Sequence, residues 1–133
     1  MQKLKTIIVD DFQIYRKSLK MVLSRSPELE NIEIEEASNG FEFLKIIENK
    51  QPSLVLMDIK MPGMTGLEAT KLAIKKYPKI KVIAISTLDD YKLIQDIEKA
   101  GAKAFMVKGF DKHMLVAVIL KVLANNKQFI TKL

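Results

Sequence analysis

Residues 54–58, Leu-Val-Leu-Met-Asp, form a short apolar run that ends on an aspartate, and this pattern decides the fold. Similar apolar runs occur at residues 6–9 (TIIV), 82–85 (VIAI) and 104–107 (AFMV). Short, continuous and partly β-branched runs are typical of strands that are buried on both faces of a sheet. Residues 32–36 alternate between isoleucine and glutamate instead, which predicts an edge strand with one face in water.

Helical patterns separate these runs, and most of them have a recognisable cap or stop residue. Their limits, in chain order, are Phe12 to Ser24, Asn39-Gly40 to Pro52, Thr65 to Pro78, Asp89 or Asp90 to Gly101, and Asp111 to Val122. The predicted apolar sides include Ile14, Leu19, Val22 and Leu23 in the first helix and Leu67, Leu72 and Ile74 in the third. Strands that alternate with helices in this way specify an α/β protein with a parallel sheet and helices on both faces.

Composition narrows the class of protein. The chain has 133 residues, 48% of them hydrophobic and 29% charged, which suits one domain with a solvated surface. It has no cysteine, so disulfides and thiolate sites are excluded. We find neither a signal-peptide core nor an apolar stretch of membrane-spanning length, and we therefore expect a soluble, cytoplasmic protein without a membrane partner. The net charge is +6, but the lysines are dispersed, which favours a solvated surface over a nucleic-acid patch.

Charged and polar residues follow four of the predicted strands. Asp10 and Asp11 end the first run, Asp58 the third, Ser86 the fourth and Lys108 the fifth. In open α/β sheets ligands bind beyond the carboxyl ends of the strands, so these side chains are expected to converge at one edge. Taken alone, each of these residues could have a purely structural role, and Asp11 in particular could simply cap the first helix.

Three converging aspartates imply a chemistry. Their mutual repulsion raises the pKa of at least one carboxyl, and a divalent cation relieves it. Oxygen ligands select a hard cation such as Mg²⁺, which binds few carboxylates and keeps several waters. A carboxylate can also attack phosphorus, while an ammonium group and a metal ion neutralise the phosphoryl charge. The pattern therefore predicts a magnesium-assisted phosphoryl acceptor.

The same residues resemble a known family. Asp10-Asp11, the segment DIKMPGMTGLE (residues 58–68), Ser86-Thr87 and GAKAFMVKG (residues 101–109) resemble the receiver domain of bacterial two-component response regulators. The resemblance covers residues 4–125 and implies a flavodoxin-like, doubly wound (βα)5 fold with strand order 2-1-3-4-5. We assign residues 1–125 to the receiver domain. Residues 126–133 form a C-terminal tail that extends or flanks the last helix, or that begins a linker to an output domain.

The resemblance also implies residue roles. Asp58 is the expected phosphoacceptor, and Lys108 is expected to pair with the phosphoryl group. Magnesium would be bound by Asp10, Asp11, Asp58 and the backbone carbonyl of Lys60. Ser86 matches the switch hydroxyl and Phe105 the switch aromatic, whose movements shift the face formed by the fourth helix, fifth strand and fifth helix.

The implied function is signalling rather than enzymatic turnover. A sensor histidine kinase or phosphotransfer protein would supply the phosphoryl group, and the shifted face would control an output domain or a partner. That face also allows a phosphorylation-dependent homodimer, and nucleic acid would be bound only through an output domain. Gly109 stands where many receivers have proline, so we expect a trans peptide bond there.

Two further residues are expected to modulate the site. Lys60 lies two residues after Asp58, where its side chain would shield the acyl phosphate from water, and Leu88 would crowd the same approach.

Other functions are less well matched by the sequence. An aspartyl phosphohydrolase needs a DxD motif, and here Asp-Asp-Phe has no aspartate at that offset. A Rossmann domain needs GxGxxG after the first strand, which is absent. A phosphate-independent binding or DNA-associated module with a vestigial acidic site stays open as the alternative.

Overall fold

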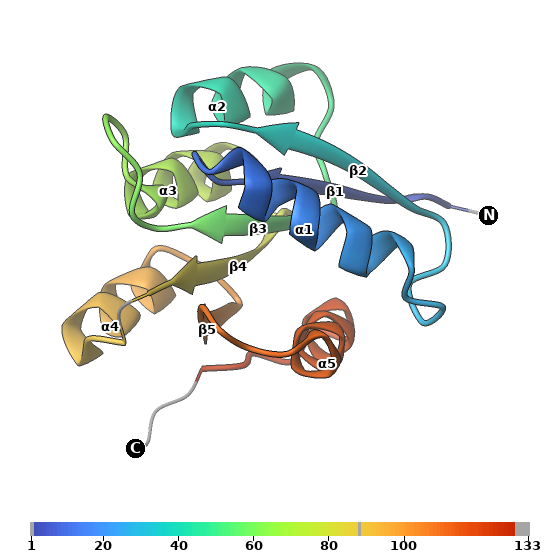
Figure 1. The fold of residues 1–133 in the computed structure, drawn as a ribbon. Coiled ribbons are helices and arrows are strands. Elements are labelled where there is room, and N and C mark those ends of the chain that lie inside the picture. The colour runs from blue at the N-terminus through green and yellow to red at the C-terminus, as the bar shows by residue number, and fades with distance from the viewer. Residues whose placement is uncertain (1, 88, 130–133) are drawn as a thin grey trace.

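The computed structural model describes residues 2–87 and 89–129 as strands alternating with helices (Figure 1). The strands are β1 (Leu4–Val9), β2 (Ile32–Ala37), β3 (Leu54–Asp58), β4 (Lys81–Ser86) and β5 (Ala104–Val107). The helices are α1 (Gln13–Ser24), α2 (Gly40–Asn49), α3 (Gly66–Lys76), α4 (Tyr91–Lys99) and α5 (Lys112–Leu123). The predicted alternation of elements is confirmed.

The strands form one five-stranded sheet in the order β2-β1-β3-β4-β5, and neighbouring strands are parallel. This confirms the flavodoxin-like doubly wound fold, with β2 at the edge as its alternating sequence predicted. The register pairs Val9 with Met57 and Ser86 with Val107. The carboxyl ends of β1 and β3, and those of β4 and β5, are therefore level with each other, and the residues that follow them share one edge of the sheet.

Two apolar clusters cover the two faces of the sheet. On one face α2, α3 and α4 pack on side chains such as Val55 and Val82, and on the other α1 and α5 pack on Leu56 and Ile83 (Figure 1). The strand residues between them are almost inaccessible to water, since Leu54 to Met57 are at most 1% exposed. This continuous burial explains why β3 reads as an unbroken apolar run.

The predicted apolar sides of two helices are partly wrong. Ile14 is 75% exposed, because at the first turn of α1 the inward position is taken by its neighbour Tyr15. Leu72 is 50% exposed, and α3 instead buries the small residues Ala69, Thr70 and Ala73. Small side chains let α3 approach its neighbours closely, but they contribute little to a hydrophobic pattern.

The predicted capping residues of α3, α4 and α5 are confirmed. Thr65 and Glu68 form a reciprocal capping box at α3, and Asp111 accepts from the backbone N–H of Met114 at α5. Asp90, one of the two candidates, caps α4. Asp11 is not the cap of α1, since the capping position is held by Phe12 without a side-chain hydrogen bond. The alternative that Asp11 only caps the first helix is therefore wrong.

The tail does not extend α5. After Leu123 the chain turns back, with Asn125 at a φ of 68°, and runs toward β5 (Figure 1). Gln128 makes a parallel bridge to Ala104: its N–H donates to the Lys103 carbonyl at 2.9 Å, and its carbonyl accepts from the Phe105 N–H at 3.1 Å. Phe129 packs against the α2–α3–α4 cluster. Residues 128–129 thus cover part of the otherwise open edge of β5.

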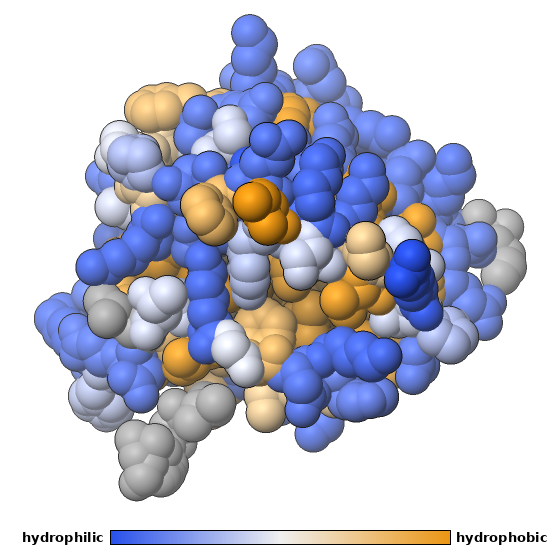
Figure 2. All heavy atoms as spheres, viewed as in Figure 1, coloured by the Kyte–Doolittle hydropathy of each residue, from blue (hydrophilic) through white to orange (hydrophobic). Residues whose placement is uncertain are grey.

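The surface is mainly hydrophilic on the face seen in Figure 2, with hydrophobic side chains gathered over α1 and in the hollow between α1 and α5. Met21, Val22, Val116 and Leu120 line this hollow. Across residues 2–87 and 89–129, no helix combines the length and the apolar character needed to cross a membrane.

Candidate metal and phosphoryl-acceptor site

The predicted convergence of carboxylates is confirmed. One ligand oxygen from each of Asp10, Asp11 and Asp58 lies within 4.8 Å of the others. Asp10 is 2% exposed and Asp58 is 5% exposed, whereas Asp11 is open to solvent. Asp10 is held in place by two backbone contacts, because its N–H donates to the Ala37 carbonyl at 3.1 Å and its Oδ1 accepts from the Phe12 N–H at 2.8 Å. The site therefore has two buried carboxylates and one at its mouth.

Lys108 reaches into the same site from the end of β5. Its Nζ lies 3.1 Å from Asp10 Oδ2 and 3.5 Å from Asp58 Oδ1. The lysine side chain is only 22% exposed, so water screens these ion pairs less than it would at an open surface. Its backbone N–H donates to the Ser86 carbonyl at 2.8 Å, which ties the lysine to the end of β4.

The electrostatic balance of the site favours an additional cation. The pKa of Asp58 is raised to about 6, mainly by burial and then by the nearby Asp10 and Asp11 carboxylates, while Lys108 acts in the opposite direction. One ammonium group thus does not compensate three carboxylates. A second positive charge placed between them would lower the repulsion and favour the ionised form of Asp58.

The residues present suit Mg²⁺. Two oxygens on opposite sides of an octahedral Mg²⁺ are about 4.2 Å apart, since each bond is about 2.1 Å long. The spread of the three carboxylate oxygens, within 4.8 Å, is close to this span. All three donors are hard oxygens, and the exposed Asp11 leaves room for the waters that Mg²⁺ retains.

The other predicted site residues lie nearby or at the rim. Ser86 is fully buried at the end of β4, and Phe105 is 1% exposed within the α2–α3–α4 cluster. Lys60 is exposed in the loop after β3. The roles assigned to these three residues stay predictions. Leu88 lies outside the described residues.

Two glycines shape the loops around the site. At Gly66 a Cβ atom would lie 2.1 Å from the Asp58 carbonyl oxygen, so only glycine allows α3 to begin against the end of β3. Gly109 has a φ of 105°, a conformation that proline cannot adopt. No described peptide bond is cis, so the Lys108–Gly109 bond is trans, as predicted.

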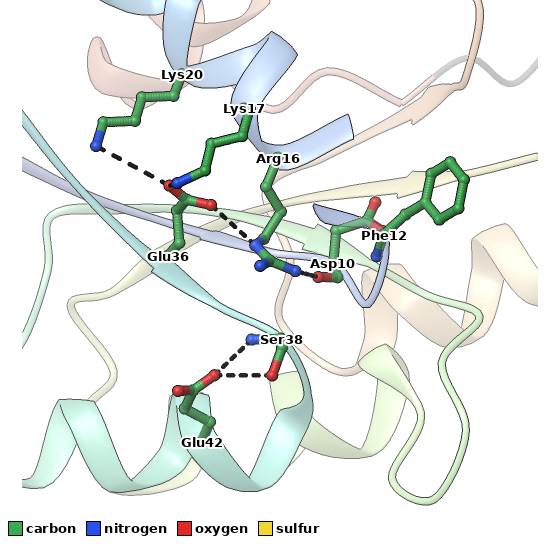
Figure 3. A network of polar contacts seen from close by, with 8 residues as sticks. All are labelled: Asp10, Phe12, Arg16, Lys17, Lys20, Glu36, Ser38 and Glu42. Atoms are coloured by element: carbon green, nitrogen blue, oxygen red, sulfur yellow. Dashed lines mark hydrogen bonds and ion pairs between the residues drawn. The ribbon is translucent and has the colours of Figure 1, made fainter. Parts of the chain in front are cut away.

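Sequence reasoning missed an ion-pair network beside the site. Figure 3 shows Arg16 of α1 lying between Glu36 at the end of β2 and the backbone of Asp10. Arg16 Nε donates to Glu36 at 2.9 Å, and Nη1 donates to the Asp10 carbonyl at 2.6 Å. Lys17 also donates to Glu36, at 2.8 Å. Glu36 is the last residue but one of β2, near the same edge as Asp10, so the edge argument could have found its position.

This network holds the Asp10 loop against β2. The side chains of Arg16 and Glu36 are only 12% and 14% exposed. Burial raises the pKa of Glu36, but the hydrogen bonds from Lys17 and Arg16 outweigh this and keep that pKa below its usual value. Glu36 is therefore ionised at neutral pH, and it compensates the charge of a guanidinium that is fixed to the loop carrying Asp10.

We expect Glu36→Gln to lower the free energy of unfolding by about 2 kcal/mol at pH 7, because it leaves the Arg16 charge largely buried without its ionic partner. Urea unfolding followed by circular dichroism measures the change. Glu33→Gln is the matched control, since Glu33 likewise pairs with basic side chains, those of Lys3 and Lys50, but on the exposed surface. The control should show no measurable change, and equal effects of both substitutions would contradict the role of the network.

The comparisons with known proteins show which family this chain belongs to. A family model of the response regulator receiver domain matches residues 6–120. The chain is 33% identical over 128 residues to the transcriptional regulatory protein DegU of Brevibacillus brevis, covering 96% of this chain and 53% of DegU. It is 36% identical over 119 residues to the chemotaxis protein CheY of Listeria monocytogenes, covering 89% of this chain and 97% of CheY.

A solved structure gives the same result. The response regulator receiver domain protein (CheY-like) from Methanospirillum hungatei superposes with a TM-score of 0.84 at 31% identity, covering 93% of this chain and 96% of that one. The chain spans about half the length of the curated transcriptional regulators that it matches. The matched residues include the strand ends that form the acidic site, and the chain thus belongs to the receiver domain family of two-component response regulators.

Proposed function

We propose that this receiver takes a phosphoryl group onto Asp58 with the help of Mg²⁺ and works as a signalling switch, not as an enzyme that turns over a substrate. The observation that carries the proposal is the position of Asp58, buried between two further carboxylates and 3.5 Å from the Lys108 ammonium. A nucleophilic carboxylate, a cation to receive the phosphoryl charge and a metal-binding pair of aspartates are the parts that phosphoryl transfer requires.

The chain's own residues have distinct tasks in this reaction. An oxygen of Asp58 forms a bond to phosphorus while the bond between phosphorus and the donor nitrogen breaks, and the electron pair leaves with that nitrogen, which is then protonated. Lys108 places its positive charge beside the Asp58 oxygen, where the transferring phosphoryl group gains negative charge. Mg²⁺, when bound by Asp10, Asp11, Asp58 and the Lys60 carbonyl, would supply further positive charge to the phosphoryl oxygens.

The donor in this proposal is a sensor histidine kinase or a phosphotransfer protein, because a phosphohistidine provides the nitrogen-bound phosphoryl group. The readout is a change of the face formed by α4, β5 and α5. Ser86 would donate its hydroxyl to a phosphoryl oxygen, and Phe105 would change its packing within the core. This face would then control a homodimer, an output domain or a partner protein.

The proposal is tested by incubating the protein with acetyl phosphate and Mg²⁺ and measuring its intact mass. We expect a gain of one phosphoryl group in the parent and in Asp96→Asn, a control that alters the Lys92–Asp96 pair on α4. Asp58→Asn and the addition of EDTA should each abolish the gain. If Lys60 shields the acyl phosphate from water, the added mass should decay faster in Lys60→Ala than in the parent, and equal rates would reject this role. If the parent gains no mass, the vestigial-site alternative is favoured.

A further inference from the structure

Lys108 has a third neighbour in the site, which the chemistry above does not use. Tyr15, in the first turn of α1, lies with its ring centroid 4.5 Å from Lys108 Nζ. A lysine ammonium within about 6 Å of an aromatic centroid is attracted by the negative face of the ring. The ammonium therefore has three partners: the Asp10 carboxylate, the Asp58 carboxylate and the Tyr15 ring.

The surroundings of Tyr15 strengthen this contact. Tyr15 is partly buried and packs at the edge of the α1–α5 cluster. Its pKa is raised to about 12, mainly by burial and also by the charges of Asp10 and Asp58, so the ring remains a neutral phenol at physiological pH. Because the Lys108 side chain is only 22% exposed, water competes weakly with the ring for the ammonium.

The ring differs from the two carboxylates in one respect. The Asp10 carboxylate, at 3.1 Å, holds the ammonium more closely than Asp58 does, but Asp10 is also a proposed metal ligand. When Asp10 is engaged in that way, its attraction for Lys108 weakens. The Tyr15 ring cannot bind a hard cation as a ligand and remains available, so it keeps a long, flexible side chain close to Asp58.

We propose that Tyr15 is a positioning residue of the phosphoryl-acceptor site: its ring holds the Lys108 ammonium beside Asp58, ready for the incoming phosphoryl group. The proposal rests on the proposed function and adds a residue to it. It predicts that loss of the ring weakens binding of a phosphoryl group at Asp58 while the affinity of the aspartates for Mg²⁺ alone is unchanged.

The test uses Tyr15→Leu, which removes the ring, and Tyr15→Phe, which keeps it. Tyr77→Leu is the matched control, because Tyr77 forms a similar pair with Lys76, at 5.6 Å, at the end of α3. Three quantities are measured: the NMR shift of the Lys108 ε-methylene protons in metal-free protein, the affinity for Mg²⁺, and the affinity for beryllofluoride, a phosphoryl mimic, in saturating Mg²⁺.

In the parent, in Tyr15→Phe and in Tyr77→Leu we expect the Lys108 signal to be shifted upfield by the ring current, and this shift should disappear in Tyr15→Leu. Tyr15→Leu should bind beryllofluoride about five- to thirtyfold more weakly than the parent, as expected for a partly desolvated pair of this type. Its affinity for Mg²⁺ should equal that of the parent, and the other two variants should bind both ligands as the parent does.

Several results would overturn the assignment. These are an unshifted Lys108 signal in the parent, equal beryllofluoride affinity in Tyr15→Leu and the parent, or equal weakening of Mg²⁺ and beryllofluoride binding, which would indicate a general structural role. Failure of the proposed function looks different. In that case the parent would bind no beryllofluoride although its Lys108 signal is shifted, and the role of Tyr15 in phosphoryl binding would fall with it.

Discussion

Asp58→Asn should raise the free energy of unfolding of the metal-free protein by about 3 kcal/mol at pH 7. The pKa of Asp58 is raised from 3.8 to about 6, first by burial and then by Asp10, so ionised Asp58 opposes folding. A difference of about two pKa units corresponds to about 3 kcal/mol. Asparagine has nearly the same shape without the charge, and Lys108 keeps its partner Asp10.

The pH dependence gives this prediction its sign. Folded Asp58 retains its proton up to about pH 6, whereas the unfolded carboxyl releases it near pH 3.8, so the folded state binds more protons between these values. The contribution of Asp58 to the stability of the parent should therefore fall as the pH rises from about 4 to about 6 and then level off. Below about pH 4 the stabilising effect of Asp58→Asn should vanish.

Urea unfolding in EDTA at a series of pH values measures both effects. Asp96→Asn is the control, because it removes a carboxylate from the surface pair with Lys92 and should follow the pH profile of the parent. If the free energy of unfolding of Asp58→Asn ran parallel to that of the parent over the whole pH range, the surroundings of Asp58 would not destabilise its ionised form.

Gly66→Ala is the second substitution with a large expected effect, a loss of about 3 kcal/mol in the free energy of unfolding. The added Cβ would lie 2.1 Å from the Asp58 carbonyl oxygen and 2.8 Å from the Ile59 Cα. Both atoms belong to the backbone, so α3 and the end of β3 must move apart. The Gly66 N–H, which donates to the Ile59 carbonyl at 2.9 Å, would move with the helix.

Gly40→Ala separates this steric effect from the general effect of replacing glycine. Its added Cβ would lie 2.8 Å from the sulfur of Met64, which can turn away, and 3.2 Å from the Met64 Cβ, which needs to shift by only a few tenths of an ångström. We expect Gly40→Ala to cost less than about 1 kcal/mol, since alanine also reduces the entropy of the unfolded chain. Thermal and urea unfolding compare the two variants, and equal losses would contradict the backbone clash at Gly66.

Residues whose place depends on the backbone could be predicted from the sequence. Parallel strands align their carboxyl ends, so Asp10, Asp58 and Lys108 could be brought together without knowledge of any side-chain contact. The caps Thr65 and Asp111 could be predicted equally well, because a capping side chain forms its hydrogen bond within its own turn. In both cases the interaction is fixed by local geometry or by strand topology.

Residues whose place depends on packing could not be predicted in this way. The apolar pattern counted Ile14 as inward, but the rotation of α1 places Tyr15 there, and only the three-dimensional packing decides between neighbours. The strand pattern could place Glu36 at the edge of the sheet, but it could not pair Glu36 with Arg16, 20 positions away, or predict the hydrogen bond from Arg16 to the Asp10 carbonyl. Gly66 has a negative φ as part of a helix, so its steric role appears only when β3 is placed beside it.

The return of the tail to β5 makes the C-terminal segment part of the surface that the strand presents. Gln128 bonds to residues on both sides of Ala104, including the backbone of Phe105 itself, and Phe129 shares a cluster with that ring. A movement of the Phe105 backbone would strain these bonds, and a movement of its ring would change the packing of the cluster that Phe129 shares, so either would act on residues 128–129 without passing through α5. A molecule that docks along this edge of the sheet would contact Gln128, and to pair with β5 at Ala104 it would have to displace Gln128 from the strand.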